Sequence, residues 1–194
     1  MDAQNEPQGS PPEAGSKRTK TGAFHKFWHG MLTQKYLEHD NQPAEVLRGL
    51  YIGSVGAGAN WAALSELGIT HILVVSETVQ PAFESSRRFE YFRVSIGDVC
   101  SARIVNFFDD SNAFIARGLV GGKVLVHCFA GKSRSATLVI AYLIATHHMS
   151  YESALALVRQ VRPQAQPNEG FAVQLNMYYG RQHIASSLEA NTLT

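Results

Sequence analysis

A run of nine residues at 127–135, His-Cys-Phe-Ala-Gly-Lys-Ser-Arg-Ser, places a cysteine and an arginine on one short segment. If this segment is a tight loop leading into a helix, its backbone N–H groups and the partial positive charge of the helix start form an anion site. Arg134 adds a planar guanidinium that can donate two hydrogen bonds to phosphate oxygens. The same surroundings favour the thiolate of Cys128, the nucleophilic form of cysteine. The run therefore predicts a loop that holds a phosphate dianion against a reactive cysteine.

Each residue of the run also has a plainer interpretation when it is taken alone. Cys128 could be an ordinary buried cysteine at a strand end, with its neighbours forming a helix cap. The combination of nine specified positions between a strand-like and a helix-like segment favours the phosphate-binding interpretation.

Two apolar segments must position this loop. Residues 123–126 have the pattern of a short strand, and Gly121 and Gly122 before them are typical of a turn. Residues 135–147 are almost continuously apolar, which is typical of a helix buried on most sides. We expect Gly131 to ease the sharp backbone turn between the two segments.

The loop resembles that of the cysteine-dependent protein phosphatases, and within them the dual-specificity group, over roughly residues 45–180. The resemblance implies an α/β fold with a central mixed sheet flanked by helices. It implies that Cys128 attacks phosphorus, that Arg134 binds the phosphoryl group, and that the Ser135 hydroxyl stabilises the departing thiolate. The substrate-binding phosphate loop would consist of Phe129, Ala130, Gly131, Lys132, Ser133 and Arg134.

Two residues of the run keep two interpretations each. His127 could tune the neighbouring thiol through hydrogen bonding, or it could be a packed strand histidine. Lys132 could add positive charge beside the phosphate, or it could be a loop lysine that faces solvent.

The implied reaction also needs an acid, because an unprotonated serine oxygen leaves very slowly at neutral pH. In the resembling family the acid precedes the cysteine by about thirty residues, and Asp98 precedes Cys128 by 30. Without that spacing, an aspartate in a glycine-containing loop would be interpreted as a turn residue. Asp98 follows a strand-like stretch at 89–96 and is the predicted proton donor.

Two other aspartates, Asp109 and Asp110, lie on a predicted helix at 101–117 with Ser101 as its cap. The helical period places both on the face opposite the apolar residues, so we interpret them as surface charges. The apolar face consists of Ile104, Phe107, Phe108 and Ile115.

A second family-like feature is the pair of segments at 162–163 and 167–171, which resembles a turn that packs beside the phosphate loop. Asn168 could hold loop backbone groups in place through its side-chain amide. It could equally cap the last helix, and the two roles are compatible.

The chain has two cysteines, which excludes a disulfide framework or a multi-cysteine zinc site. Cys100 lies two residues after Asp98, and it is either a half-buried thiol or a partner that traps an oxidised Cys128 as a disulfide. The implied chemistry needs no metal or organic cofactor, because cysteine, arginine and aspartate supply nucleophile, electrostatic stabilisation and acid.

A chain of 194 residues with 45% hydrophobic residues and a net charge of +1 can bury one core. We predict a disordered tail at 1–22, an amphipathic segment at 23–42, a catalytic domain at 43–185 and a flexible C-terminus at 186–194. The longest apolar run, 136–145, is too short to span a bilayer. We expect a cytoplasmic protein, with a nuclear location as a further option, and no nucleic-acid partner. The other predicted elements are strands at 50–53 and 69–75, a helix at 61–67 capped by Asn60, and helices at 151–161 and 171–179.

The amphipathic segment carries a stripe of apolar residues at helical spacing: Phe24, Phe27, Trp28, Met31 and Leu32. Such a stripe packs on its own domain or binds a partner in trans. The basic residues at 17–20 are compatible with a nuclear signal, a kinase-docking motif or part of a calmodulin target.

Within the resembling superfamily, tyrosine-specific enzymes carry Trp-Pro-Asp at the acid, whereas this chain has Ile96-Gly97-Asp98. The resemblance therefore implies a shallow pocket and dual specificity toward a phosphorylated protein, for example a MAP kinase. Inositol-lipid phosphatases often have a basic residue directly after the cysteine, where this chain has Phe129. A lipid or other phosphate ester is the enzymatic alternative, and a domain that binds phosphoproteins without turnover is the alternative of another class.

Overall fold

The computed structural model describes the backbone of residues 20–192 and the side chains of residues 30–182. The predicted disordered tail lies outside the described residues except for its last three, which begin a helix. In chain order the elements are α1 (Lys20–His39), β1 (Ala44–Leu47), β2 (Leu50–Gly53), α2 (Val55–Ala59), α3 (Trp61–Leu67), β3 (His71–Val75), η1 (Glu84–Ser86), β4 (Glu90–Val94), η2 (Ile104–Phe107), α4 (Phe108–Leu119), β5 (Val124–His127), α5 (Arg134–His147), α6 (Tyr151–Val161) and α7 (Glu169–Thr192).

The five strands form one mixed sheet in the order β1-β2-β5-β3-β4. β1 pairs antiparallel with β2, and the other pairs are parallel. β5 therefore lies at the centre of the sheet, and its carboxyl end lies between the carboxyl ends of its parallel neighbours β2 and β3. This confirms the predicted α/β class with a central mixed sheet, and ligands of such sheets bind outside the carboxyl ends of the strands.

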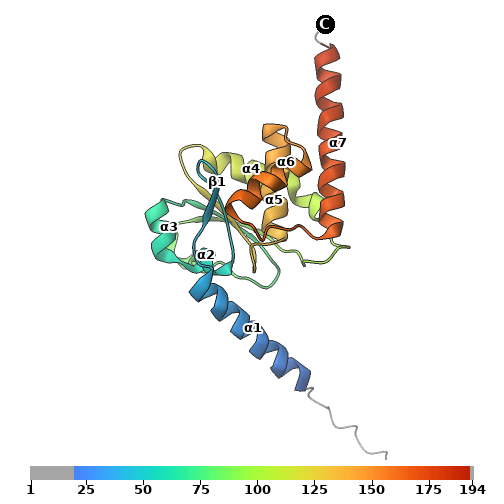
Figure 1. The fold of residues 1–194 in the computed structure, drawn as a ribbon. Helices are drawn as coiled ribbons and strands as arrows, with labels where there is room; N and C mark the ends of the chain where they lie inside the picture. The colour runs from blue at the N-terminus through green and yellow to red at the C-terminus, as the bar shows by residue number, and fades with distance from the viewer. Residues whose placement is uncertain (1–19, 193–194) are drawn as a thin grey trace, which may run out of the picture.

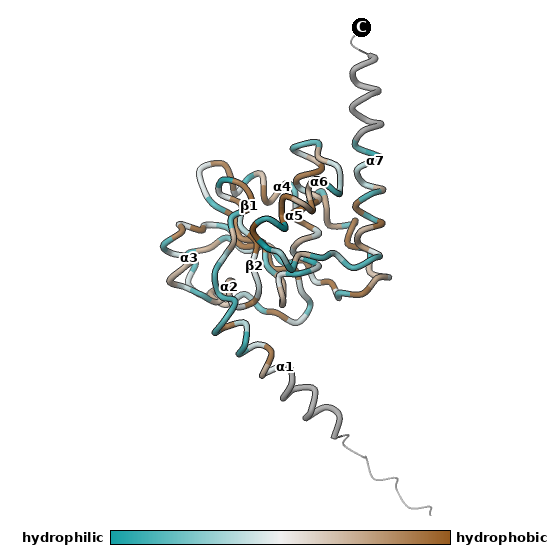
Figure 2. The backbone as a smooth tube through the Cα atoms, in the orientation of Figure 1, coloured by the Kyte–Doolittle hydropathy of each residue, from teal (hydrophilic) through white to brown (hydrophobic). Residues whose placement is uncertain are grey.

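Side chains alternate between the two faces of the sheet, as the period of a strand requires. On β5, Val124 and Val126 join the larger cluster with α4, α5, α6 and α7, whereas Leu125 joins the smaller cluster with α3. Figure 2 shows apolar residues concentrated in the sheet and in α5. α5 is buried on almost every side, as its continuous apolar sequence predicts.

The predicted helix at 101–117 is wrong in its first part. The backbone turns through η2 and becomes α-helical only at Phe108, and Ser101 caps no helix. The reason is tertiary: Gln174 of α7 accepts the N–H of Val105 and donates to the carbonyl of Ala102. Because these backbone groups form hydrogen bonds with the Gln174 side chain, they do not form the i to i+4 hydrogen bonds of an α-helix.

Other boundaries differ by smaller amounts. The strand predicted at 69–75 starts at His71, because the N–H of Ile69 donates to the carbonyl of Leu64 at the end of α3. The strand predicted at 89–96 is shortened to β4, and the strand predicted at 123–126 is shifted to Val124–His127. The helix predicted at 171–179 extends from Glu169 to Thr192, so most of the predicted flexible C-terminus at 186–194 has helical backbone.

α1 and α7 both extend beyond the body of the domain (Figure 1). Met31 and Leu32 of α1 are 52% and 41% exposed, so these two members of the apolar stripe are not part of the core. The side chains of Phe24, Phe27 and Trp28 lie outside the described residues. Between residues 20 and 192, no helix combines the length and apolar character needed to cross a membrane.

Candidate active site

Cys128 and Arg134 lie at the two ends of one loop, at the carboxyl end of the central strand β5 and at the start of α5. The Cys128 side chain is buried, with 1% of its surface exposed. The backbone N–H of Gly131 donates to Cys128 Sγ at 3.2 Å, and the hydroxyl of Ser135 lies 3.3 Å from the same sulfur. The sulfur therefore has two neighbours, an N–H and a hydroxyl, that can donate hydrogen bonds to it and stabilise a negative charge on it.

Gly131 is required at the sharpest point of the loop. Its φ angle is +63°, in the left-handed region that other residues rarely adopt. A Cβ atom at this position would lie 2.5 Å from the carbonyl oxygen of Gly53 and 2.5 Å from Nη2 of Arg162. Both the backbone angle and the close packing exclude a side chain here.

The guanidinium of Arg162 supports the outside of this turn. Its Nε donates to the carbonyl of Gly131 at 2.6 Å, and its Nη2 donates to the carbonyl of Ala130 at 2.9 Å. The side chain is only 4% exposed, and its charge is paired with Asp40 through contacts of 3.1 Å and 2.6 Å. A buried cation needs such a partner because its desolvation is costly. The turn at 162–163 thus lies beside the phosphate loop, as the resemblance implied.

The guanidinium of Arg134 is held at one edge by two oxygen atoms. Its Nη1 donates to the hydroxyl of Ser76, after β3, at 3.2 Å and lies 3.4 Å from the carbonyl of Ile96. Its Nε is buried and has no hydrogen bond among the described residues, although Asp98 Oδ2 lies 3.5 Å away. The Nε group is therefore an orphan buried donor that a bound oxyanion could satisfy.

Asp98 lies against the phosphate loop. Its Oδ1 accepts from the hydroxyl of Ser133 at 2.6 Å and from the side-chain amide of Asn168 at 2.9 Å. The Asp98 side chain remains about one-third exposed, so it borders solvent as well as the site. The structure therefore brings together the three residues Cys128, Arg134 and Asp98.

Asn168 performs the predicted capping role and a second role that differs from the prediction. Its Oδ1 accepts the N–H of Phe171 at 3.0 Å in the first turn of α7. Its side-chain amide donates to Asp98, and it has no hydrogen bond to the loop backbone among the described residues, which differs from the prediction. The link to the loop runs instead from the Asn168 backbone N–H to the hydroxyl of Ser133 at 3.1 Å.

His127 fits the interpretation of a packed strand histidine. Burial lowers the pKa of its imidazole to about 4, so the ring is neutral at physiological pH. Its Nδ1 lies 3.3 Å from the backbone carbonyl of Cys128, and that contact is to the backbone and not to the thiol. The ring packs on Gly58, where a Cβ atom would lie 2.6 Å from it.

Lys132 is exposed, and its backbone carbonyl accepts the N–H of Gln166 at 2.7 Å. It borders a hollow of about 550 Å³ together with Asp98 and Ser133.

Phe129 packs against α1, where its ring makes an edge-to-face contact with Tyr36 at a centroid distance of 5.4 Å. The pKa of the Tyr36 phenol is raised, first by burial and then by the negative charges of Asp40 and Cys128.

The remaining candidates make no hydrogen bond or ion pair with Cys128, Arg134 or Asp98 in the described part of the chain. Asp109 and Asp110 are exposed, as their helical positions predicted. Cys100 is an exposed free thiol, not the half-buried one expected, and Cys128 is a buried free thiol, so the two form no disulfide in this structure.

The candidates from the sequence did not include Ser76, Asp40 or Tyr36, all of which contact residues of the site. Ser76 could have been found, because it follows a strand next to β5 in a parallel sheet, where the carboxyl ends meet. Tyr36 lies in the last turn of α1 and Asp40 directly follows that helix, and the sequence contains no local signal that this segment reaches the loop.

The model of the dual specificity phosphatase catalytic domain family matches residues 50–181. Dual specificity protein phosphatase 1 of Arabidopsis thaliana is 43% identical over 137 residues, which cover 70% of this chain and 68% of that protein. MAP kinase phosphatase with leucine-rich repeats protein 3 of Dictyostelium discoideum is 41% identical over 137 residues, which cover 70% of this chain and 16% of that protein. The crystal structure of the human tyrosine phosphatase-like serine/threonine/tyrosine-interacting protein has a TM-score of 0.69 and 37% identity, and the match covers 72% of this chain and 97% of that one.

With a thiol, a guanidinium and a carboxyl group gathered at the carboxyl end of the central strand, this chain belongs to the dual specificity phosphatase family. It is a protein phosphatase.

Proposed function

We propose that this phosphatase hydrolyses phosphotyrosine and phosphoserine or phosphothreonine in proteins through a cysteinyl-phosphate intermediate. The observation that carries the proposal is the surroundings of Cys128 Sγ, which has the Gly131 N–H and the Ser135 hydroxyl within 3.3 Å. These donors stabilise the thiolate both before it attacks and when it leaves.

In the first step, the Cys128 thiolate forms a bond to phosphorus and the ester P–O bond breaks. The leaving oxygen takes a proton from the Asp98 carboxyl group, and Arg134 together with the loop N–H groups holds the phosphoryl oxygens. In the second step, water attacks phosphorus, Asp98 takes the water's proton, and the P–S bond breaks. The products are inorganic phosphate and the thiolate, which the Ser135 hydroxyl stabilises.

The shared role of Asn168 and Ser133 supports Asp98 as the proton donor. Both donate to Asp98 Oδ1, at 2.9 Å and 2.6 Å, and keep the carboxyl group beside the loop. The same carboxyl group reaches toward Arg134 Nε at 3.5 Å, the position where a phosphoryl oxygen would compete for that donor.

A MAP kinase is one candidate substrate, since the Dictyostelium relative bears that activity in its name. Phe129 at the position after the cysteine supports a protein substrate over an inositol lipid, because it adds no positive charge to the loop. We also retain the cytoplasm as the proposed location.

The test is hydrolysis of para-nitrophenyl phosphate by the wild type and by Cys128→Ser, with EDTA and a reducing agent present, followed by phosphotyrosine and phosphothreonine peptides. We expect turnover by the wild type alone and turnover of both peptides. A folded, reduced wild type without activity would contradict the proposal and favour a phosphoprotein-binding role. Activity on a phosphoinositide far above that on either peptide would favour the lipid alternative.

A further inference from the structure

One face of α7 lies beside the turn at 100–105, which follows Asp98, and carries exposed apolar side chains. Val173, Met177 and Arg181 recur at intervals of four residues, so they share one face of the helix. Val173 and Met177 are 59% and 64% exposed, although the opposite face of α7 is buried in the core. Two large apolar residues that remain uncovered beside a catalytic site suggest a binding surface.

This face lines a hollow of about 410 Å³ between α7 and the turn at 100–105. The hollow shares Cys100 with the hollow of about 550 Å³ that contains Asp98 and Lys132. It also shares Arg103 and Arg181 with a further hollow of about 440 Å³ farther along α7. The three hollows follow one another through these shared lining residues, from Asp98 to Arg181, and we call them together the α7 trough.

The length of the α7 trough suits a short extended peptide. From residue 169 to residue 181 a helix rises about 18 Å, at 1.5 Å per residue. An extended chain covers that distance with about five residues. A polypeptide whose phosphorylated residue enters the phosphate loop could therefore continue along α7 without bending away.

The charge of the middle hollow defines the chemistry of its occupant. Arg103 and Arg181 are its charged lining residues, and no acidic side chain lines it. Neither arginine has an ion-pair partner among the side chains of residues 30–182. Glu169 borders the near hollow and Asp109 the far one, so the positive charge is concentrated in the middle.

We propose that the α7 trough binds an acidic segment of the substrate protein next to its phosphorylated residue. Carboxylates of that segment pair with Arg103 and Arg181, and an apolar side chain packs on Val173 and Met177. This inference rests on the proposed function, because it assigns the polypeptide around the phosphate that the catalytic loop would hydrolyse. It supplies sequence preference, which the shallow phosphate loop alone cannot provide.

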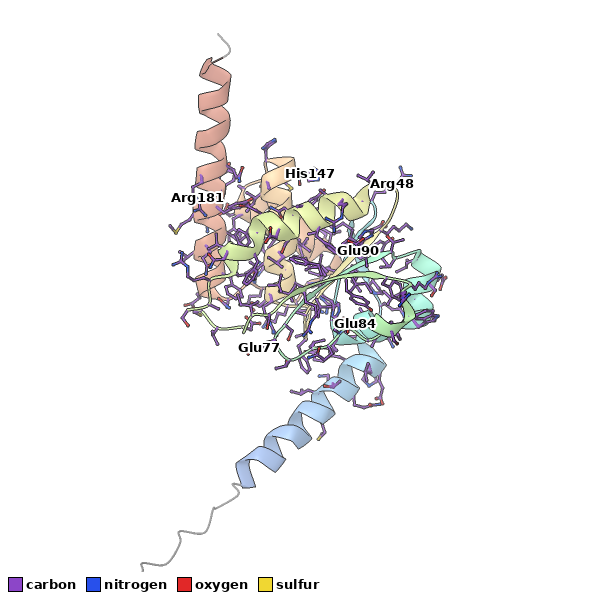
Figure 3. All side chains as sticks on the ribbon, turned by 180° about the vertical axis from the view of Figure 1, so that it is seen from behind. Arg48, Glu77, Glu84, Glu90, His147 and Arg181 are labelled. Carbon is purple, nitrogen blue, oxygen red and sulfur yellow. The ribbon has the colours of Figure 1, made fainter. Side chains whose placement is uncertain are left out.

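The experiment compares three phosphotyrosine peptides with the same core. One has an acidic extension with one leucine on the N-terminal side, one has that extension on the C-terminal side, and one has neutral extensions. The enzymes are the wild type, the double variant Arg103→Gln/Arg181→Gln, and Arg48→Gln as the matched control. Arg48 is an exposed arginine far from Arg181 (Figure 3).

We expect the wild type to prefer one acidic peptide and the double variant to lose that preference. The double variant removes two exposed ion pairs with the peptide, so the loss should be roughly twofold to thirtyfold in kcat/KM. The lost preference should appear as a higher KM for the acidic peptide, and the difference between the two enzymes should shrink as the salt concentration rises. Arg48→Gln should behave as the wild type, and para-nitrophenyl phosphate should be hydrolysed equally by all three enzymes. The variant Arg103→Lys/Arg181→Lys should retain most of the preference, because it keeps the charge.

Three outcomes would overturn the inference. The wild type could show no preference for either acidic peptide, the double variant could keep the preference, or it could lose the same activity on all substrates including para-nitrophenyl phosphate. If the wild type does not hydrolyse para-nitrophenyl phosphate at all, the proposed function fails instead. Binding to the α7 trough is then measured by fluorescence anisotropy with fluorescently labelled forms of the three peptides. Equal binding of the acidic peptides by the wild type and the double variant would contradict the inference.

Discussion

Asp40 and Arg162 are 122 positions apart in the chain, yet the two contacts between them, at 3.1 Å and 2.6 Å, tie the end of α1 to the phosphate loop. Arg162 in turn donates hydrogen bonds to the carbonyls of Ala130 and Gly131 in the loop. Asp40 is itself held by the hydroxyl of Ser54, which donates to its backbone carbonyl at 2.6 Å. The shape of the catalytic loop therefore depends on a segment that contains none of the proposed catalytic residues.

Asp40→Ala should destabilise the protein and impair the loop. Removing one partner leaves the buried Arg162 charge unpaired, which costs about 3 kcal/mol in comparable buried pairs. Urea unfolding measures this loss, with Asp110→Ala, an exposed aspartate on α4, as the control that should change stability by less than about 0.5 kcal/mol. We also expect weaker inhibition by vanadate, because Arg162, which donates to the loop carbonyls, loses the carboxylate that fixes its position. Unchanged stability and vanadate affinity would show that the pair does not hold the loop.

Gly131→Ala should nearly abolish activity. The methyl group would meet the carbonyl oxygen of Gly53 at 2.5 Å, and alanine disfavours a φ of +63°. The loop must shift, which moves the N–H that donates to Cys128 Sγ. Gly180→Ala in α7 is the matched control, since nothing lies within 4 Å of its added methyl group. Kinetics on para-nitrophenyl phosphate decide the matter, and wild-type rates in Gly131→Ala would contradict the tight packing of the loop.

Asp98→Asn should lower kcat by about 10²-fold to 10⁴-fold on phosphoserine peptides, the range that general acid catalysis contributes. The loss should be smaller with para-nitrophenyl phosphate, whose leaving group needs less protonation. Vanadate should bind as before, because Arg134 and the loop N–H groups remain. Equal losses on both substrates would remove Asp98 from the role of proton donor.

Stability should fall between neutral and mildly acidic pH because of His127. Its pKa is lowered to about 4 in the folded protein by burial, whereas an unfolded histidine titrates near 6.5. Between these values the unfolded chain binds a proton that the folded protein excludes, so stability is full above about pH 6.5 and is lost as the pH falls toward 4. Between pH 7.5 and pH 5 the loss should be about 2 kcal/mol.

Urea unfolding of the wild type and of His127→Asn at these two pH values measures the effect. We expect the variant to be less stable at pH 7.5 but to lose clearly less stability between the two values. An equal loss in both proteins would assign the pH dependence to other groups.

The sequence alone determined the features that depend on neighbours in the chain. The run at 127–135 predicts its strand end, loop and helix start because its cysteine, glycine and arginine lie within seven consecutive residues of one loop. Helix α6 begins and ends where predicted, at Tyr151 and Val161, because its apolar period and the Ser150 cap are local signals. Asn60 caps α3 for the same reason.

The tertiary structure alone decided which distant residues complete the site. Sheet order brings Ser76 to Arg134, and packing of α7 brings Asn168 to Asp98 and Gln174 to the turn before α4. The partner of Arg162 is Asp40, directly after α1, where neither hydrophobic period nor capping signal indicates it. Local sequence sets the conformation of each segment, but a side chain's partner depends on where the other segments pack, and that is a property of the whole core.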